Sequence, residues 1–303
     1  MIIKNISIGT VIDGKWLKHK YKLLELLGKG GIGRVYKAMN LENKGVYAVK
    51  ITDDIQSITK ESDVLKQFQS IESFPRFIEA DDCIVDNNKY YYIVMEYIEG
   101  QNLNETLRDC GLSDKEILGI GLIIGRTLQI LHKEGLVFGD LKLENLMLDK
   151  KNKILRIIDL GGVTPIGHCV NEFTQQYDRA SWNAGIRKAD QQYDLFSLNM
   201  LITNLLFKNI VPLKDYDIEK LLNKISEKEM PAKLKTVITC GFRQVILFDH
   251  YVYQLENIYN KYEYSAKLYS KTRLNTAINY LMVGSVLGFM ALLAVYGEKI
   301  SNF

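Results

Sequence analysis

The sequence predicts an α+β protein of two lobes, a small antiparallel β-lobe with one helix followed by a larger, mainly helical lobe. Two observations predict this division. Short segments of β-type residues dominate residues 20–96. After Gly100 the apolar residues recur at helical spacing, and proline is rare in the whole chain, as is typical of a helical lobe.

The first lobe is predicted to contain strands around a glycine-rich loop. Strands are expected at Tyr21–Leu27 and Arg34–Met39, on the two sides of that loop, and a third at Val46–Ile51. Thr59–Phe68 has its apolar residues at helical spacing. Tyr90–Glu96, which reads Y-Y-I-V-M-E, is expected to be a buried strand.

The second lobe is predicted to open with a long helix over Ser113–Lys133. Ser113 is the expected N-cap, and Glu116 three residues later completes a capping box. Gly135 is expected to end the helix. Two strands, a helix and a helical region follow in order, at Leu146–Leu148, Leu155–Ile158, Tyr193–Phe207 and residues 212–272.

The glycine-rich loop reads G-K-G-G-I-G-R-V and contains a G-x-G-x-x-G pattern at Gly28, Gly30 and Gly33. Glycines let backbone N–H groups close over phosphates without a clash from a Cβ atom. The same pattern also occurs at the start of a Rossmann helix. Here it lies between two predicted strands, which favours a loop that covers a nucleotide.

Lys50 ends the third predicted strand and is expected to hold the α- and β-phosphates of ATP. Its ammonium would itself be held by a carboxylate of the following helix. Glu61 is the preferred partner and Asp63 the alternative. The other residues assigned to the nucleotide site are Val35, Ala48 and Glu96.

Two acidic motifs follow in the second lobe, D-L-K-L-E-N from Asp140 and D-L-G from Asp159. Asp140 is expected to orient the substrate hydroxyl and accept its proton, and Lys142 to neutralise the moving phosphoryl group. Asn145 and Asp159 are the expected Mg²⁺ ligands. A polar turn after a helix would explain one of these residues but not three at this spacing.

In order and spacing, these motifs resemble those of eukaryotic-like Ser/Thr protein kinases over residues 20–210. F-G-D-L-K-L-E-N-L, I-D-L-G-G-V-T and Y-D-R-A-S-W-N-A-G-I-R-K-A-D further resemble the YabT-type membrane-tethered sporulation kinases of Firmicutes, some of which respond to DNA. The resemblance implies a bilobal protein-kinase fold, ATP and Mg²⁺ as cofactors, and protein substrates. It carries over to the matched positions Gly28, Gly30, Gly33, Lys50, Glu61, Asp140, Lys142, Asn145 and Asp159.

The chain departs from the family at three places. The family's H-R-D is Phe138-Gly139-Asp140, so an activation-loop phosphate lacks its usual arginine partner, and we expect a weaker dependence on loop phosphorylation. D-F-G is replaced by D-L-G, a change between apolar residues. No A-P-E is present around Ala180–Trp182, so the usual buried Glu–Arg brace is expected to be absent or rebuilt.

Four further residues have expected roles. Thr164 and Thr174 are candidate autophosphorylation sites, although Thr174 could instead contact Asp140 and Lys142 through its hydroxyl. Asp194, at the start of a predicted helix, stands where kinases brace the catalytic loop. His132 is interpreted as structural.

An uncharged segment of twenty residues, Ala277–Tyr296, is predicted to be a transmembrane helix about 30 Å long. Lys267, Lys271 and Arg273 precede it, which orients residues 1–276 to the cytoplasm at a cell membrane. A buried core helix is the alternative. Gly284 and Gly288 form a G-x-x-x-G that permits close helix pairing, so a homodimer through the span or the kinase domain is one oligomeric state that the sequence allows.

The predicted domains run from an N-terminal extension to a short outer tail. Their ranges are 1–19 for the extension, 20–272 for the kinase domain with lobes 20–96 and 101–272, 277–296 for the span, and 297–303 for the tail.

Charge and cysteine usage exclude some other classes of protein. The net charge is +3 without a basic run, so DNA is only a weakly supported partner; residues 208–276 hold twelve Lys and Arg against eight acids. The four cysteines form no C-x-x-C pair and indicate reduced thiols. Two alternative functions remain, a small-molecule phosphotransferase, suggested by Gly139-Asp140, and an inactive pseudokinase scaffold on the membrane.

Overall fold

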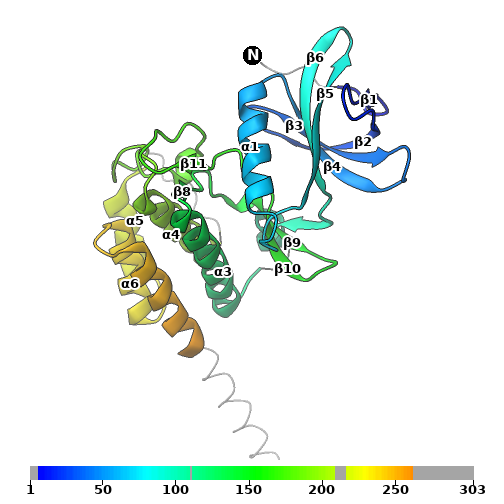
Figure 1. Cartoon of the computed structure of the whole chain (residues 1–303). Helices are drawn as coiled ribbons and strands as arrows, with labels where there is room; N and C mark the ends of the chain where they lie inside the picture. Colours follow the sequence, from blue (N-terminus) through cyan, green and yellow to red (C-terminus); the bar gives the residue numbers. More distant parts are fainter. Residues whose placement is uncertain (1–5, 110, 209–215, 262–303) are drawn as a thin grey trace, which may run out of the picture. The chain divides into compact units, whose positions relative to one another are not determined.

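The computed structural model describes residues 6–109, 111–208 and 216–261. The chain divides into two compact units, Met1–Leu255 and Glu256–Phe303, and only the first is described below. In this unit a strand-rich lobe is followed by a helical lobe, as the sequence predicts (Figure 1).

A twisted antiparallel sheet of six strands forms the first lobe, in the spatial order β1-β2-β3-β4-β6-β5. The strands are β1 Val11–Asp13, β2 Lys20–Lys29, β3 Arg34–Asn40, β4 Val46–Thr52, β5 Phe77–Val85 and β6 Asn88–Glu96. Tyrosines and branched residues alternate along β2 and β3, so one face is apolar. Ile12, Tyr21, Leu23 and Tyr36, each at most 1% exposed, pack in the core beneath that face.

Two strands of this sheet were not predicted. β5 contains Glu79, Asp81 and Asp82 within an otherwise apolar strand, and β1 belongs to residues 1–19, which the sequence assigned to an extension. Ile12 of β1 is fully buried and the strand pairs with β2, so these residues are part of the sheet.

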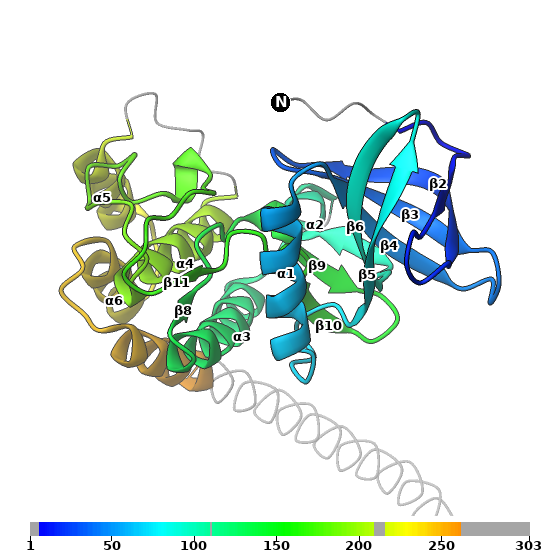
Figure 2. The ribbon, with the colours of Figure 1, turned by 45° about the horizontal axis from the view of Figure 1, so that its top comes forward.

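Helix α1, Ile55–Gln67, lies on the side of the sheet toward the helical lobe (Figures 1 and 2). The Asp54 side chain caps it by accepting hydrogen bonds from the backbone N–H groups of Gln56 and Ser57. The helix therefore begins four residues before the predicted start at Thr59, and its first turn adds Ile55 and the buried Ile58 at helical spacing, which the prediction left out.

The helical lobe is built on α3, Asp114–Lys133, packed against α4, Gln191–Leu206. Ser113 caps α3 with Glu116 in a reciprocal capping box, as predicted. Gly135 follows with φ +74°, a backbone conformation that favours glycine. The other helices of this lobe are α2 Leu103–Asp109, α5 Ile218–Glu227, α6 Ala232–Phe242 and a helix that begins at residue 248.

Two small sheets complete this lobe. β9, Leu146–Asp149, pairs with β10, Ile154–Ile157, and with the short β7, Gly100–Asn102. β8, Leu136–Val137, pairs with β11, Thr164–Pro165. The loops beside these strands contain the D-L-K-L-E-N and D-L-G motifs.

The predicted membrane span, Ala277–Tyr296, lies outside the described residues. Among the residues that are described, no helix is both long and apolar enough to cross a bilayer.

Candidate active site

The glycine-rich loop connects β2 to β3 at the edge of the strand lobe. The ladder between these strands reaches Lys29↔Arg34, and the N–H of Gly30 donates to the carbonyl of Gly33 across the turn. A Cβ atom on Gly33 would lie 3.0 Å from the carbonyl oxygen of Ile51. A Cβ on Gly28 would meet open space. The loop thus leaves room beside its backbone at Gly28, as a loop that closes over phosphates requires, whereas Gly33 lets the loop approach β4 closely.

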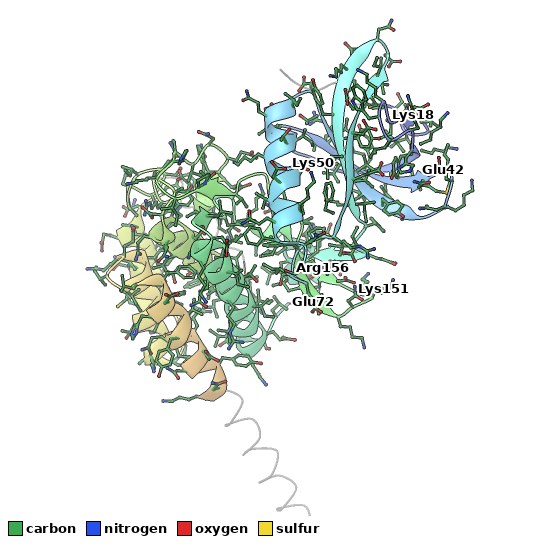
Figure 3. All side chains as sticks on the ribbon, viewed as in Figure 1. Lys18, Glu42, Lys50, Glu72, Lys151 and Arg156 are labelled. Atoms are coloured by element: carbon green, nitrogen blue, oxygen red, sulfur yellow. The ribbon has the colours of Figure 1, made fainter. Side chains whose placement is uncertain are left out.

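Lys50 joins three elements. Its Nζ lies 2.6 Å from Oε2 of Glu61 on α1 and 3.0 Å from Oδ1 of Asp159 in the D-L-G loop. Lys50 is 8% exposed and Glu61 1% exposed. Figure 3 shows Lys50 beside α1. One ammonium therefore connects the sheet, the helix and the second lobe.

The alternative partner, Asp63, does not take part in this contact. Its side chain is 69% exposed and lies 3.9 Å from Lys66 on the same helix. Residues two apart on a helix point in different directions, and the structure turns Glu61 inward.

Val35 and Ala48 share one face of the sheet with Lys50. Val35 pairs with Lys50 across β3 and β4, and Ala48 lies two residues before Lys50 on the same strand. Met95 of β6 pairs with Ala48 and is 3% exposed. This face presents apolar surface next to the lysine, as an adenine ring requires.

Glu96 points away from that face. Its carboxylate accepts hydrogen bonds from the Arg156 guanidinium and from the backbone N–H of Arg76, 3.2 Å away. The side chain of Glu96 is therefore engaged between the lobes, and its backbone N–H donates to the carbonyl of Arg76 at 2.9 Å.

A buried carboxylate shapes the catalytic loop. Asp194, at the start of α4, accepts hydrogen bonds from the N–H groups of Phe138 (2.9 Å) and Gly139 (3.1 Å). His132 Nε2 lies 2.8 Å from the same carboxylate, and both side chains are buried. His132 thus helps to orient the Asp194 carboxylate that holds the catalytic loop, and it does not face the reacting groups.

Asp140 is the centre of a second polar cluster. Its Oδ1 accepts a hydrogen bond from Thr174 Oγ1 at 2.9 Å, and its Oδ2 accepts one from the Lys142 ammonium. Asn145 Nδ2 donates to the Asp140 backbone carbonyl at 3.0 Å. The activation loop and the catalytic loop therefore meet at this carboxylate.

Asn145 and Asp159 offer the oxygen atoms that Mg²⁺ prefers. The Asn145 nitrogen is used by Asp140, which leaves its oxygen for a ligand, and Asp159 Oδ1 accepts from Gly161 N at 3.1 Å. In the described part of the chain, no group of three or more His, Cys, Asp or Glu could hold a metal. This donor set fits Mg²⁺, which is usually bound by one or two protein ligands together with substrate phosphates.

Lys50 and Asp159 stabilise each other's charge, whereas burial raises the pKa of Glu61 despite the nearby Lys50. Burial alone lowers the pKa of Lys50, but the carboxylates of Glu61 and Asp159 outweigh it and raise the pKa, so the lysine is charged. Burial likewise raises the pKa of Asp159, but Lys50 and the Gly161 N–H lower it below its ordinary value. Asp159 is thus ionised and ready to bind a cation.

Glu172 is a residue that the sequence analysis missed. A Cβ on Gly161 would lie 3.3 Å from its Oε2, and the Lys60 ammonium donates to the Gly161 carbonyl at 3.3 Å. Burial raises the pKa of Glu172, and the nearby Asp159 raises it further. No motif marks this residue, because only the path of the activation loop brings it to the D-L-G turn.

A brace is present at the end of the activation loop, although A-P-E is absent. Fully buried Asp178 accepts from Arg187 Nη2 at 2.8 Å and from Tyr193 Oη at 3.0 Å. Arg179 lies 2.7 Å from Asp190. The ion pairs are thus rebuilt within the segment itself. Thr164, the other candidate phosphorylation site, is 6% exposed and donates to the Gly162 carbonyl.

Comparison with known proteins agrees with this geometry. Residues 21–265 match the model of the protein kinase domain. This chain belongs to the protein kinase family. It is 37% identical over 239 residues to the serine/threonine-protein kinase YabT of Bacillus subtilis, an alignment that covers 77% of this chain and 70% of that protein.

Two longer relatives match over a similar part of the chain. A probable serine/threonine-protein kinase of Clostridium perfringens is 26% identical over 73% of this chain and 33% of its own length. NUAK family SNF1-like kinase 2 of Rattus norvegicus is 28% identical over 76% of this chain and 38% of its own length. The chain is therefore a Ser/Thr protein kinase similar to YabT, and the fold agrees with the bilobal kinase fold predicted from the sequence.

Proposed function

We propose that this kinase is catalytically active and transfers the γ-phosphate of ATP to Ser and Thr hydroxyls of proteins, at the cytoplasmic face of a membrane. The contact of Lys50 with both Glu61 and Asp159 carries the proposal of activity. A buried charge is expensive to maintain unless it is paired, and this pairing joins the parts that must align for phosphoryl transfer.

In the proposed mechanism, Asp140 is the group that receives the substrate hydroxyl. Its carboxylate orients the hydroxyl oxygen and accepts the proton, while the Thr174 hydroxyl fixes the rotamer of the carboxylate. Lys142, in contact with the same carboxylate, supplies positive charge next to the attacking oxygen.

The nucleotide side of the site is assigned to the strand lobe. Gly28, Gly30 and Gly33 cover the phosphates, Lys50 binds them, and Val35 and Ala48 contact the base. Bound Mg-ATP supplies the phosphoryl group and the metal charge, and Asn145 and Asp159 are the residues that would hold the metal.

Phosphate transfer by the full chain in detergent tests this proposal. We expect labelling of the kinase and of a generic basic protein with Mg-ATP, and loss of both in Asp140→Asn and Lys50→Met. Binding of nucleotide with no transfer by the wild type would favour the pseudokinase scaffold. Transfer to an aminoglycoside and to no protein would favour the small-molecule phosphotransferase.

The membrane location rests on the sequence of Ala277–Tyr296, which is uncharged for twenty residues and is preceded by Lys267, Lys271 and Arg273. We expect the full chain to remain with vesicles after alkaline carbonate extraction, and the kinase domain to be digested by protease added on the cytoplasmic side. Release by carbonate would contradict the span.

Three further proposals concern regulation. A role in sporulation is supported by the resemblance alone, and normal sporulation of a deletion strain would contradict it.

Activation by DNA would raise the rate of phosphate transfer at low salt. Dimerisation through Gly284 and Gly288 would be lost in Gly284→Ile, as measured by crosslinking in vesicles.

A further inference from the structure

The turn between β1 and β2 is held by acidic side chains of β5, the strand at the other edge of the twisted sheet, which contacts β1. The N–H groups of Trp16 and Leu17 donate to the Asp81 carboxylate, with closest distances of 3.1 and 2.8 Å. The N–H of Lys15 donates to the carbonyl of Asp82 at 2.8 Å. Asp81 is 9% exposed, so these charge-assisted bonds lie largely out of water.

Other contacts restrict the same turn. A Cβ on Gly14 would lie 2.6 Å from Asp81 Oδ2, so a side chain there would displace the carboxylate that holds the turn. His19 Nδ1 lies 2.6 Å from Glu79 Oε2 at the far end of the turn. Lys18 has φ +63°, an uncommon conformation for a residue other than glycine. The backbone is therefore fixed in one arrangement from both ends.

This fixed turn presents large apolar side chains to water. Trp16 is 69% exposed and Leu17 47% exposed, whereas Trp182 in the helical lobe is 2% exposed. The Lys15 ammonium lies 4.7 Å from the centre of the Trp16 ring. A constrained backbone that exposes Trp and Leu at its tip indicates a contact surface, because these residues otherwise favour the interior.

The segment around the tip is positively charged. Residues 14–22 read G-K-W-L-K-H-K-Y-K and contain four lysines and no acid. Lys20 pairs with Asp13 at 3.1 Å. Among the described residues, no carboxylate lies within ion-pair distance of Lys15, Lys18 or Lys22. Lys15 and Lys18 thus flank the exposed Trp-Leu pair in the sequence, while the acids that contact the turn, Asp81 and Glu79, are each only 9% exposed.

We propose that the β1–β2 turn, residues 14–19, is a second membrane contact, which inserts Trp16 and Leu17 among the headgroups of anionic lipids while its lysines bind lipid phosphates. Tryptophan favours the boundary between headgroups and acyl chains, and lysines near the surface are attracted to anionic lipid. This proposal extends the proposed membrane location, which brings the turn close to lipid and raises its effective concentration there.

The chemistry of the turn fits lipid better than nucleic acid. Residues 14–22 contain no arginine, and two adjacent apolar side chains form the tip where a nucleic-acid surface would offer a basic groove. Figure 3 places Lys18 at the outer side of the strand lobe, away from Lys50. Lipid bound at the turn would leave the nucleotide site open.

The fluorescence of Trp16 in vesicles tests the proposal. The full chain is reconstituted in phosphatidylcholine vesicles with and without phosphatidylglycerol, using lipids with brominated chains, which quench tryptophan on contact. Subtracting the signal of Trp16→Tyr isolates Trp16 from Trp182. We expect strong quenching of the Trp16 signal in anionic vesicles and little in neutral ones.

Lysine variants test the electrostatic part. The double variant Lys15→Gln, Lys18→Gln should lower the affinity of the turn for anionic vesicles by about fivefold per lysine. The exposed pair Lys66→Gln with Lys233→Gln is the matched control and should leave it unchanged. Phosphate transfer in detergent should be the same in the wild type, in Trp16→Tyr and in the two double lysine variants.

Three outcomes would overturn the proposal. The first is Trp16 fluorescence that acrylamide quenches equally with and without anionic lipid. The second is quenching that persists in the double lysine variant. The third is protection of Trp16 by single-stranded DNA and not by lipid. Carbonate extraction from neutral vesicles tests separately whether Ala277–Tyr296 spans the membrane. A failure of the proposed span is therefore distinguished from a failure of the proposed lipid contact at the turn.

Discussion

Gly139 and Gly162 are in backbone contact, since a Cβ atom on Gly139 would lie 2.6 Å from the carbonyl oxygen of Gly162. Gly139 has φ +82° and directly precedes Asp140. The residue after the D-L-G motif therefore packs against the position where related kinases have the arginine of H-R-D. A side chain at residue 139 would push the metal-binding loop away from Asp140.

Substitution of Gly139 should accordingly damage both stability and activity. Gly139→Ala combines a penalty for positive φ with a steric overlap, about 2–4 kcal/mol together. Gly135→Ala is the matched control, because Gly135 has φ +74° but open space around its Cβ position, so it should cost about 1 kcal/mol and keep activity. Thermal unfolding and phosphate transfer of the full chain measure both. Equal losses in the two variants would contradict the role of the contact.

The ion pair of Lys50 with Glu61 should matter for transfer, and the neighbouring acid should not. Glu61→Gln keeps the shape of the side chain but removes the charge that holds Lys50, and we expect a loss of about tenfold or more in kcat/KM, at least about 1.4 kcal/mol. Asp63→Asn, on the same helix but exposed, should stay within about twofold. Equal activity of Glu61→Gln and wild type would contradict the assignment.

The parts that sequence predicted well are those decided by local interactions. The Ser113–Glu116 capping box lies within four residues, and helix α3 begins where it was expected. The strands beside the glycine loop are likewise marked by short apolar repeats. β5 was not predicted, because Glu79, Asp81 and Asp82 interrupt its apolar residues; their partners, such as the turn held by Asp81, lie far away in sequence.

The same distinction holds for the candidate site. Motif spacing identified Lys50 and Asp140 because each belongs to a short pattern. Glu172 has no such pattern, and Asp178, although part of the Y-D-R-A-S-W segment, was assigned no role from sequence; the contacts of both follow from the path of the activation loop. The partner of a buried charge can be chosen from sequence only when the helical face is known, as for Glu61.

The rebuilt brace should give the kinase an acid-sensitive stability. Burial alone raises the pKa of Asp178, but hydrogen bonds from Ser181, Arg187 and Tyr193 lower it below the ordinary value. A carboxyl group with a lowered folded-state pKa stabilises fully above its unfolded pKa, about 3.9, and loses this as pH falls through the folded pKa. Asp178→Asn should cost about 2 kcal/mol near pH 7, since Arg187 is partly exposed.

The melting temperature of the full chain in detergent, measured against pH, checks this. The difference between wild type and Asp178→Asn should be constant from neutral pH down to about pH 5 and should narrow below about pH 4. Asp63→Asn, an exposed carboxylate, should follow the wild type throughout. A difference that stays constant to the lowest pH would show that the Asp178 charge does not support the fold.

Thr174 should act through its hydroxyl and not through a phosphate. Its Oγ1 donates to Asp140 Oδ1 at 2.9 Å, so a negative group there would face the carboxylate that receives the substrate. Thr174→Ser should retain activity, while Thr174→Val should lose about tenfold or more because Asp140 loses a partner that fixes its rotamer. Thr174→Glu should be inactive, since like charges at this distance repel. Phosphate transfer to a basic protein compares the three variants. If Thr174→Ala were inactive and Thr174→Glu active, loop phosphorylation would be required, and the expectation drawn from the missing arginine at Gly139 would be wrong.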